Sequence, residues 1–262
     1  MELIDTHCHL DFPVFDADRE ALLTRWRQLG VGEYIIPAVG EENWGRVMAL
    51  AGRHDDIRYG LGIHPWYVGK QPRDALTRLE TLLASRPRGL VAVGECGLDL
   101  RSHVPQEGQV EMFEAQVRLA MAHALPLIVH SVRANDTVAK ILRRFTPPQG
   151  GVIHAFSGSL HQAEVFWQLG FRLGIGGVIS YERANKTREA IRQMPLEALL
   201  LETDAPDMPL QGQQGEVNTP ASLPTIARLL AQLRQQPLED VISVLHDSTR
   251  RLFPPGNHEI NI

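Results

Sequence analysis

The sequence predicts a closed (β/α)8 barrel, in which eight parallel strands are surrounded by helices. Eight short apolar runs, rich in β-branched residues, recur through the 262 residues at intervals of about 20 to 35 residues. Helix-like stretches separate these runs, and no low-complexity segment or linker divides the chain. Because eight strand-then-helix units fill a chain of this length, we expect one barrel domain over residues 1–262.

The eight predicted strands follow one another in the order of the chain. They span 2–7, 33–39, 59–64, 90–95, 126–131, 151–156, 171–177 and 198–204. An open, doubly wound sheet is the alternative arrangement. Such sheets usually have fewer strands, and no G-x-G-x-x-G motif follows the first run here. The barrel is therefore favoured.

Amphipathic stretches predict the outer layer of helices. The clearest ones span 16–30, 107–124, 219–234 and 238–253. In the second, apolar residues recur at three- and four-residue spacing, which is typical of a helix with one buried face. Gly30, Gly150 and Gly170 stand where helices should end before a strand, and glycine is favoured at such positions. The last two stretches would complete the layer after the eighth strand.

Composition and charge limit the classes of protein to consider. The 44% of hydrophobic residues can build a sizeable core, and the net charge of −5 gives no general attraction for nucleic acid or anionic membranes. No apolar run approaches the roughly 18 residues that span a bilayer, and the first residues lack the features of a signal peptide. Two cysteines suit a reducing compartment. We expect a soluble, cytoplasmic monomer without an obligatory protein partner.

Histidines and acids gather at the ends of the predicted strands. In a barrel these ends form one rim, where active sites are built. The residues concerned are His7, His9, His64, Glu95, His130, His154 and Asp204. A single one of them could be a hydrogen-bonded histidine or a helix cap. Several imidazoles buried together are unfavourable unless something coordinates them, so the set predicts a metal centre.

The His-x-His pair of the first strand has a defined geometry. Because side chains alternate along a strand, Asp5, His7 and His9 share the face toward the barrel mouth, and Cys8 points outward beneath a helix. Cys96 is expected to point outward in the same way. Asp5 lies one layer below the two histidines, where we expect it to orient an imidazole from behind.

The donor set indicates which cations bind and how many. Imidazole and carboxylate suit Zn²⁺, Mn²⁺ or Fe²⁺, and a site for Mg²⁺ alone would be richer in oxygen. The histidines and acids exceed the needs of one tetrahedral ion, so we expect two divalent cations bridged by Glu95. Asp204 is expected to bind one ion and accept the proton of the attacking water. Glu202, on the face of Asp204, either supports a ligand, contacts substrate or pairs with a buried cation.

Six strings that contain these residues resemble the TatD family of metal-dependent hydrolases. They are IDTHCHLD (4–11), GIHPW (62–66), VGECGLD (93–99), VHSVRA (129–134), HAFSG (154–158) and ETDAP (202–206). The resemblance runs nearly end to end. It implies a barrel of the amidohydrolase type with two divalent metals (Zn²⁺, Mn²⁺ or Mg²⁺) and phosphoesterase activity, commonly on DNA. Leu100, Arg101, Val132 and Ala155 depart from common family residues, which bears on substrate preference and not on the metals.

The resemblance also implies how the residues divide between the two ions. His7, His9, Glu95 and Asp204 would hold one ion, and Glu95, His130 and His154 would hold the other. His64 would then face the scissile phosphate. The residues alone do not separate His64 from the ligands.

We therefore expect a hydrolase acting on ester bonds, a deoxyribonuclease that attacks DNA ends or single strands with a water activated by two metals. Asp204, His64 and Glu95 form the expected catalytic set. Arg133 is expected either beside the phosphate or in solvent, and Trp66 either stacks on a base or packs at the rim. The substrate could also be a small phosphoester. The alternatives are an amide or ester hydrolase of the amidohydrolase type and a metal-binding protein without catalysis.

Overall fold

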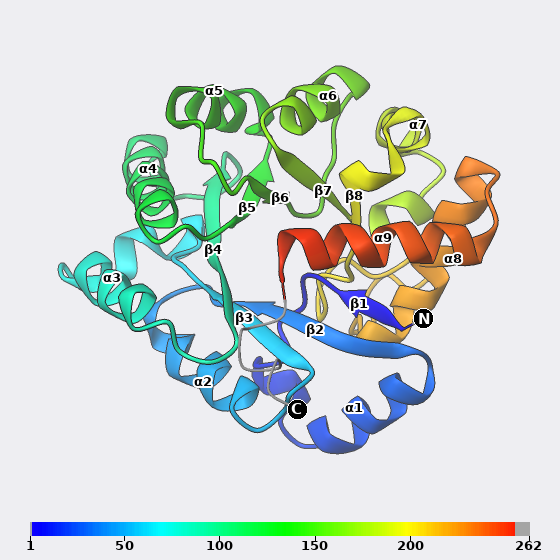
Figure 1. Ribbon diagram of the computed structural model, residues 1–262, viewed down its shortest axis with the longest axis horizontal. Helices are drawn as coiled ribbons and strands as arrows, with labels where there is room; N and C mark the ends of the chain where they lie inside the picture. Colours follow the sequence, from blue (N-terminus) through cyan, green and yellow to red (C-terminus); the bar gives the residue numbers. More distant parts are fainter. Residues whose placement is uncertain (1, 255–262) are drawn as a thin grey trace.

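Eight parallel strands form a ring in which each strand pairs with the next one in the chain (Figure 1). The computed structural model describes residues 2–254, so residue 1 and residues 255–262 of the predicted domain lie outside the described part. The strands are β1 (Leu3–Asp5), β2 (Val31–Pro37), β3 (Ile57–Leu61), β4 (Leu90–Asp99), β5 (Leu127–Val132), β6 (Gly151–Ile153), β7 (Phe171–Ile175) and β8 (Leu199–Leu201). The predicted (β/α)8 barrel is confirmed.

Helices cover the outside of this ring. The α-helices are α1 (Arg19–Gln28), α2 (Glu41–Ala51), α3 (Ala75–Ser85), α4 (Gln106–Ala122), α5 (Asn135–Phe145), α6 (Leu160–Gln168), α7 (Asn185–Gln193), α8 (Leu223–Arg234) and α9 (Leu238–Leu252). Short 3-10 helices lie at η1 (Pro13–Phe15), η2 (Pro65–Lys70), η3 (Gly177–Ser180), η4 (Leu196–Ala198) and η5 (Pro220–Ser222). None of the helices within residues 2–254 has the length and apolar character needed to cross a membrane.

Six of the eight strands end two or three residues earlier than predicted, and β4 and β5 end later. β1, β6 and β8 stop before His7, His154 and Asp204, which therefore lie in the segments just beyond the ladder. Asp204 has a left-handed backbone with φ of 58°. Such a conformation ends regular pairing and turns the chain at the barrel mouth. β4 instead continues to Asp99, although the prediction ended it at residue 95.

The ring closes between the ends of β8 and β1. Here the Asp204 N–H donates to the His7 carbonyl oxygen over 2.8 Å, and the His9 N–H donates to the Ala205 carbonyl oxygen over 2.7 Å. We call these two segments, residues 5–9 and 201–205, the seam. The seam therefore joins three of the seven predicted site residues, His7, His9 and Asp204, where the barrel closes.

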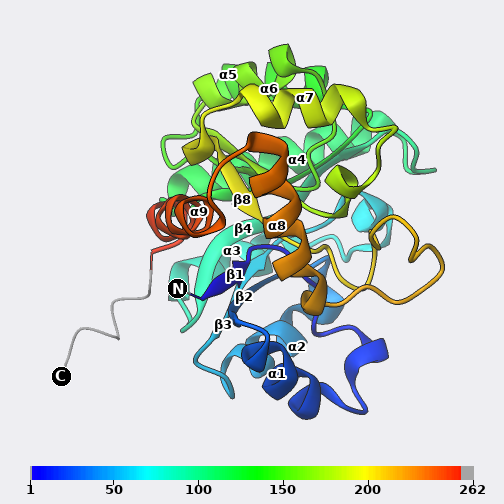
Figure 2. The ribbon, with the colours of Figure 1, turned by 90° about the vertical axis from the view of Figure 1, so that its right-hand side faces the viewer.

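Two separate cores fill the barrel. The larger one lies between the strands and the helices, and it includes Cys8 and Cys96, which are both fully buried as free thiols. The smaller one fills the inside of the ring with Ile35, Val91, Ala92, Ile128, Val152, Leu200, Leu252 and Phe253. Both cysteines therefore face outward, as predicted. Figure 2 shows α9 at one end of the barrel and the connection from β8 to α8 at the other.

Candidate metal centre

All seven residues predicted for the site come together at the C-terminal end of the strands. They are His7 and His9 after β1, His64 after β3, Glu95 in β4, His130 in β5, His154 after β6 and Asp204 after β8. Six of them are buried. The Asp204 side chain is 15% exposed, so it faces both the cluster and solvent.

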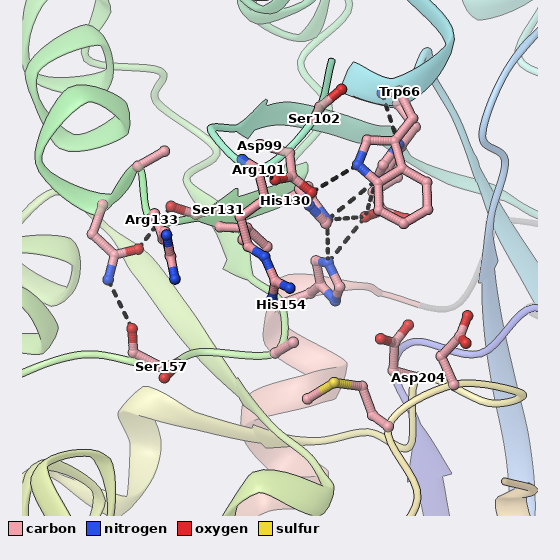
Figure 3. Close-up of a pocket in the computed structure, with 18 of the residues that line it drawn as sticks. Trp66, Asp99, Arg101, Ser102, His130, Ser131, Arg133, His154, Ser157 and Asp204 are labelled. Atoms are coloured by element: carbon pink, nitrogen blue, oxygen red, sulfur yellow. Dashed lines mark hydrogen bonds and ion pairs between the residues drawn. The ribbon is translucent and has the colours of Figure 1, made fainter. Parts of the chain in front are cut away.

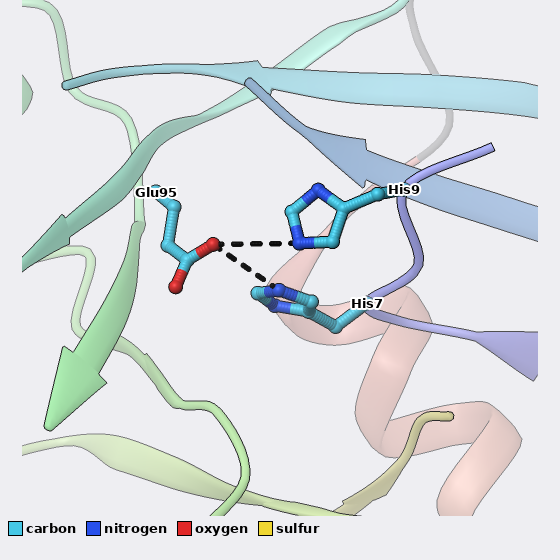
Figure 4. Close-up of side chains that lie close together, drawn as sticks. All are labelled: His7, His9 and Glu95. Atoms are coloured by element: carbon cyan, nitrogen blue, oxygen red, sulfur yellow. Dashed lines mark ion pairs between the residues drawn. The ribbon is translucent and has the colours of Figure 1, made fainter. Parts of the chain in front are cut away.

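Glu95 lies at the centre of the cluster, with histidines on both sides. Its Oε2 is 3.4 Å from His7 Nε2 and 3.7 Å from His9 Nε2 (Figure 4). Its Oε1 is 2.8 Å from His130 Nδ1 and 2.9 Å from His154 Nε2. Each carboxylate oxygen thus faces its own pair of imidazoles. This is the arrangement that the predicted bridging role requires.

A bulge in β4 directs Glu95 into this position. The pairing of β4 with β5 shifts register between Val93 and Cys96, so β4 carries one residue more than its partner there. The Glu95 N–H leaves this ladder and donates to the Ala38 carbonyl oxygen on the other side over 2.8 Å. The bulge therefore keeps Val93 and Cys96 in the outer core while Glu95 faces the barrel mouth.

Asp204 joins one of the two histidine pairs. Its Oδ1 is 3.5 Å from His7 Nε2 and 3.7 Å from His9 Nε2. The two histidines and the acids Glu95 and Asp204 therefore point four donor groups at one volume. This is the set that the sequence resemblance implies for one ion.

His64 lies beside the other pair. Its Nε2 is 3.2 Å from His130 Nδ1 and 3.5 Å from Glu95 Oε1, and His130 Nδ1 is 3.0 Å from His154 Nε2. His64 is thus as close to this group as a ligand would be. Its implied role, facing a phosphate instead of a metal, stays a prediction.

The unpartnered atoms of the cluster test whether a cation fits. Both ring nitrogens of His7 are buried and have no hydrogen-bond partner among residues 2–254. A buried imidazole left this way is unfavourable, because its nitrogens lose the hydrogen bonds of water. The nitrogens and carboxylate oxygens that converge here are the ligands that Zn²⁺ and similar divalent cations prefer. The residues fit a divalent metal.

The pKa values of the metal-free cluster show how its charges are shared. Burial disfavours a charged imidazole at His154, but the Glu95 carboxylate outweighs burial and raises the pKa of His154 to about 10. Burial also opposes ionisation of Glu95, yet the surrounding histidines hold its pKa well below the ordinary value. For His7, burial and the charge of His154 together lower the pKa well below its usual range. An anionic Glu95 and a neutral His7 are the forms that bind metal.

Asp5 does not orient an imidazole, and that prediction is wrong. Its Oδ1 accepts from the Thr203 N–H over 2.9 Å, and its Oδ2 accepts from the Thr203 hydroxyl over 2.6 Å. The His7 backbone N–H also donates to Oδ1, over 3.3 Å. Asp5 therefore ties the two sides of the seam together and holds the backbone of His7 instead of its ring.

Glu202 lies directly behind the cluster. The Glu202 side chain is fully buried. Its Oε1 accepts a hydrogen bond from the Ala155 N–H and lies 3.8 Å from His154 Nδ1. It occupies the space that a side chain at Gly174 would need, since a Cβ there would lie 2.0 Å from Glu202 Oε2. Of the three predicted alternatives, this placement favours support of the ligand His154, through the backbone of Ala155 and not through a hydrogen bond to the imidazole ring. Glu202 has no exposed surface and is absent from the pocket lining, so it offers nothing for substrate to contact.

Asp99 belongs to the site, and the sequence interpretation missed it. Its Oδ2 is 3.2 Å from His130 Nε2 and accepts from the Trp66 indole N–H over 2.7 Å (Figure 3). The signal was present, because Asp99 lies four residues after Glu95 on the same face of an alternating strand. Ending the predicted strand at residue 95 hid it.

The cluster forms the floor of a pocket of about 1720 Å³. Basic side chains line this pocket at Lys70, Arg101, Arg133, Arg183 and Lys186. Trp66 also lines it and is 53% exposed, so this ring is available for contact. Ser157 and Gly158 lie on the same wall. These five basic side chains outnumber the acids that line the pocket outside the cluster, which are Asp99, Asp136 and Asp207.

We expect removal of metal to lower the thermal unfolding midpoint. A cation at one hundred times its dissociation constant stabilises by about 2.7 kcal/mol, which corresponds to roughly 5–10 °C for a domain of this size. Calorimetry of chelator-treated protein, before and after resupply of Zn²⁺, measures the shift. His7→Asn should abolish most of it, whereas His103→Asn, at an exposed histidine outside the cluster, should retain it. A midpoint insensitive to metal in all three proteins contradicts the prediction.

Comparisons with known proteins agree with this geometry. The family model "TatD related DNase" matches residues 4–254. An uncharacterized metal-dependent hydrolase, YjjV of Escherichia coli K12, is 47% identical over 95% of this chain and 97% of its own length. Its crystal structure, described as a TatD homolog, superposes with a TM-score of 0.93 over 96% of this chain and 97% of that one.

Two further relatives extend the comparison. An uncharacterized metal-dependent hydrolase of Haemophilus influenzae is 36% identical over 97% of this chain and its full length. The 3'-5' ssDNA/RNA exonuclease TatD of Pantoea ananatis is 29% identical over 96% of this chain and 99% of its own. The family model spans the barrel from the first strand to the last helix. The chain belongs to the TatD family of metal-dependent hydrolases.

Proposed function

We propose that this hydrolase cleaves phosphodiester bonds and removes nucleotides from the ends of single-stranded DNA. The observation that carries the proposal is the pocket, whose floor is the ligand cluster and whose wall holds five basic side chains. In a protein of net charge −5, such a local positive wall suits an anionic chain held near one end. The name of the Pantoea relative, a single-strand exonuclease, supports the same reading.

Two divalent cations are proposed to bind in the cluster. One would be held by His7, His9, Glu95 and Asp204, and the other by Glu95, His130 and His154. When bound, such cations lower the pKa of water and neutralise charge on phosphate oxygens. The Asp204 carboxylate, which is the partly exposed acid of the set, is the group placed to accept the proton of the attacking water.

His64 is proposed to donate a hydrogen bond to a phosphate oxygen. Its Nδ1 accepts from the Trp66 backbone N–H over 3.1 Å, which leaves the hydrogen of the neutral ring on Nε2. Burial lowers the pKa of His64 to about 3, so the ring is neutral at physiological pH. His64 therefore contributes an oriented N–H and not a positive charge. The positive charge comes from arginines and lysines of the wall.

Trp66 and Arg133 are proposed to bind the nucleotide beyond the scissile bond. The exposed Trp66 ring offers a face on which a base can stack, an interaction worth about 1–3 kcal/mol. Arg133 lines the pocket from the turn after β5, where its φ of 54° departs from the strand. Arg133→Gln should therefore raise KM and leave kcat close to its original value. Arg143→Gln, at the exposed far end of α5, is the matched control.

One experiment separates this proposal from its rivals. Metal-free protein is reloaded singly with Zn²⁺, Mn²⁺ or Mg²⁺ and given labelled linear single strands, a circular single strand and cyclic amides. Stepwise shortening of the linear strands with an intact circle is expected. Equal cleavage of the circle contradicts attack at ends, and turnover of amides alone points to a small-molecule hydrolase. Tight, metal-free, strongly salt-dependent binding to long duplexes also counts against the proposal.

A further inference from the structure

A single carboxylate oxygen joins the ligand cluster to the exposed wall of the pocket. Asp99 Oδ2 faces His130 Nε2 at 3.2 Å and the Trp66 indole N–H at 2.7 Å. We propose that Asp99 is a positioning residue that holds His130 in its metal-binding orientation and couples metal occupancy to the position of Trp66. The proposal rests on the metal dependence of the family and not on the nature of the substrate.

Asp99 is itself held rigidly. The buried Gln109 side chain of α4 accepts from the Asp99 N–H over 2.8 Å and donates to the Asp99 carbonyl oxygen over 3.1 Å. The Arg101 N–H donates to Oδ1 over 2.8 Å. Both backbone groups and one carboxylate oxygen are therefore committed to their partners. Only Oδ2 remains to accept hydrogen bonds from His130 and Trp66.

The contact with Asp99 determines which nitrogen of His130 faces the cluster. Both ring nitrogens of His130 face carboxylates, Nε2 that of Asp99 and Nδ1 that of Glu95, so without a cation each of them has an acceptor for a hydrogen. Nδ1 is the atom that lies 2.8 Å from Glu95 and 3.0 Å from His154 Nε2. When a cation takes Nδ1, the Asp99 carboxylate would keep the remaining hydrogen on Nε2 and hold the ring in place, and carboxylates that do this for ligand histidines affect metal affinity strongly.

Trp66 is connected to the cluster by two routes. Its indole reaches His130 through Asp99, and its backbone N–H donates to His64 Nδ1. Its ring is 53% exposed toward the pocket. A cation that draws charge from His130 strengthens the hydrogen bond of His130 to Asp99 and weakens the competing bond to the indole. If cation binding changes the affinity of a ligand that contacts the indole by some factor, then by linkage that ligand changes the cation affinity by the same factor.

The test uses Asp99→Asn, with Asp136→Asn as the matched control. Asparagine has one carboxamide oxygen. It therefore cannot accept the hydrogen bond of the Arg101 N–H and also those that Oδ2 accepts from His130 and Trp66. Zn²⁺ binding is measured by equilibrium titration with metal analysis. We expect the affinity of one bound ion to fall about 10- to 100-fold in Asp99→Asn. Asp136→Asn also removes one negative charge from the same pocket, but its side chain pairs with Gln162, so its affinity should equal that of the original protein.

Tryptophan fluorescence tests the coupling independently. Of the four tryptophans, Trp66 is the one that lines the pocket, and Trp66→Phe keeps a ring while it removes the indole N–H. Zn²⁺ should change the fluorescence of the original protein, and this change should be missing in Trp66→Phe and reduced in Asp99→Asn. A fluorescence change that is the same in Trp66→Phe overturns the coupling, even if Asp99→Asn fails to fold. Unaltered Zn²⁺ affinity in a folded Asp99→Asn overturns the positioning role.

Discussion

Asp204→Asn is expected to lower kcat by roughly 10²- to 10⁴-fold while most of the metal stays bound. The substitution removes the proposed proton acceptor and keeps an oxygen near His7 and His9, whose Nε2 atoms lie 3.5 Å and 3.7 Å from Oδ1. The backbone should tolerate it, because φ at this position is 58° and asparagine adopts left-handed conformations readily. The loss is therefore attributable to the carboxylate.

Asp207→Asn is the control for this prediction. Asp207 lines the same pocket and is exposed, so its substitution removes the same charge without touching the cluster. Steady-state rates are measured on each protein together with its metal content. Undiminished turnover in Asp204→Asn contradicts the assigned role. Loss of metal in step with turnover would make Asp204 a ligand without a role in proton transfer.

Gly97→Ala is expected to destabilise the protein by roughly 3–5 kcal/mol and to disrupt the metal centre. A Cβ at Gly97 would lie 2.1 Å from the carbonyl oxygen of His130 and 2.9 Å from its nitrogen. Both are backbone atoms of the neighbouring strand, so no side chain can swing away to relieve the overlap. The φ of 134° at Gly97 adds strain for any residue with a side chain.

Gly45→Ala is expected to have the opposite effect on stability. Gly45 lies in α2 in an exposed position, and a Cβ there meets nothing within 4 Å. Alanine at such a helix position should stabilise by about 0.5–1 kcal/mol. Urea unfolding of the two variants measures both effects. A Gly97→Ala protein that unfolds at the original urea concentration would contradict the proposed close approach of β4 and β5.

The sequence was sufficient for the barrel and for the seven clustered residues, and the reason is geometric. Parallel strands bring their C-terminal ends to one rim, and alternation decides which side chains face inward, so His7, His9 and His130 could be placed without knowing any contact. Glu95 was placed correctly although a bulge precedes it. The bulge changes the face of the residues before Glu95 and leaves Glu95 itself directed at the mouth.

The sequence did not show in the same way which groups the acids around the cluster would hydrogen-bond. Asp5 was correctly placed below the histidines, but its bonds to Thr203 depend on how β1 meets β8. Asp99 was missed because the end of β4 is set by pairing with β5, which local sequence does not show. The basic wall of the pocket gathers residues from the four connections that follow β3, β4, β5 and β7, so composition gave only the opposite overall charge.

The seam has a consequence for the order in which the protein is made. Its hydrogen bonds join residues separated by up to 198 positions, and His7 and Asp204 meet across it. A chain still being synthesised therefore carries His7 and His9 from the start and lacks Asp204 until most of the barrel has left the ribosome. Contacts of such long range form late in folding. A chain that ends before Asp204 lacks one member of the cluster, so the complete set of seven residues requires all eight strands to have been made.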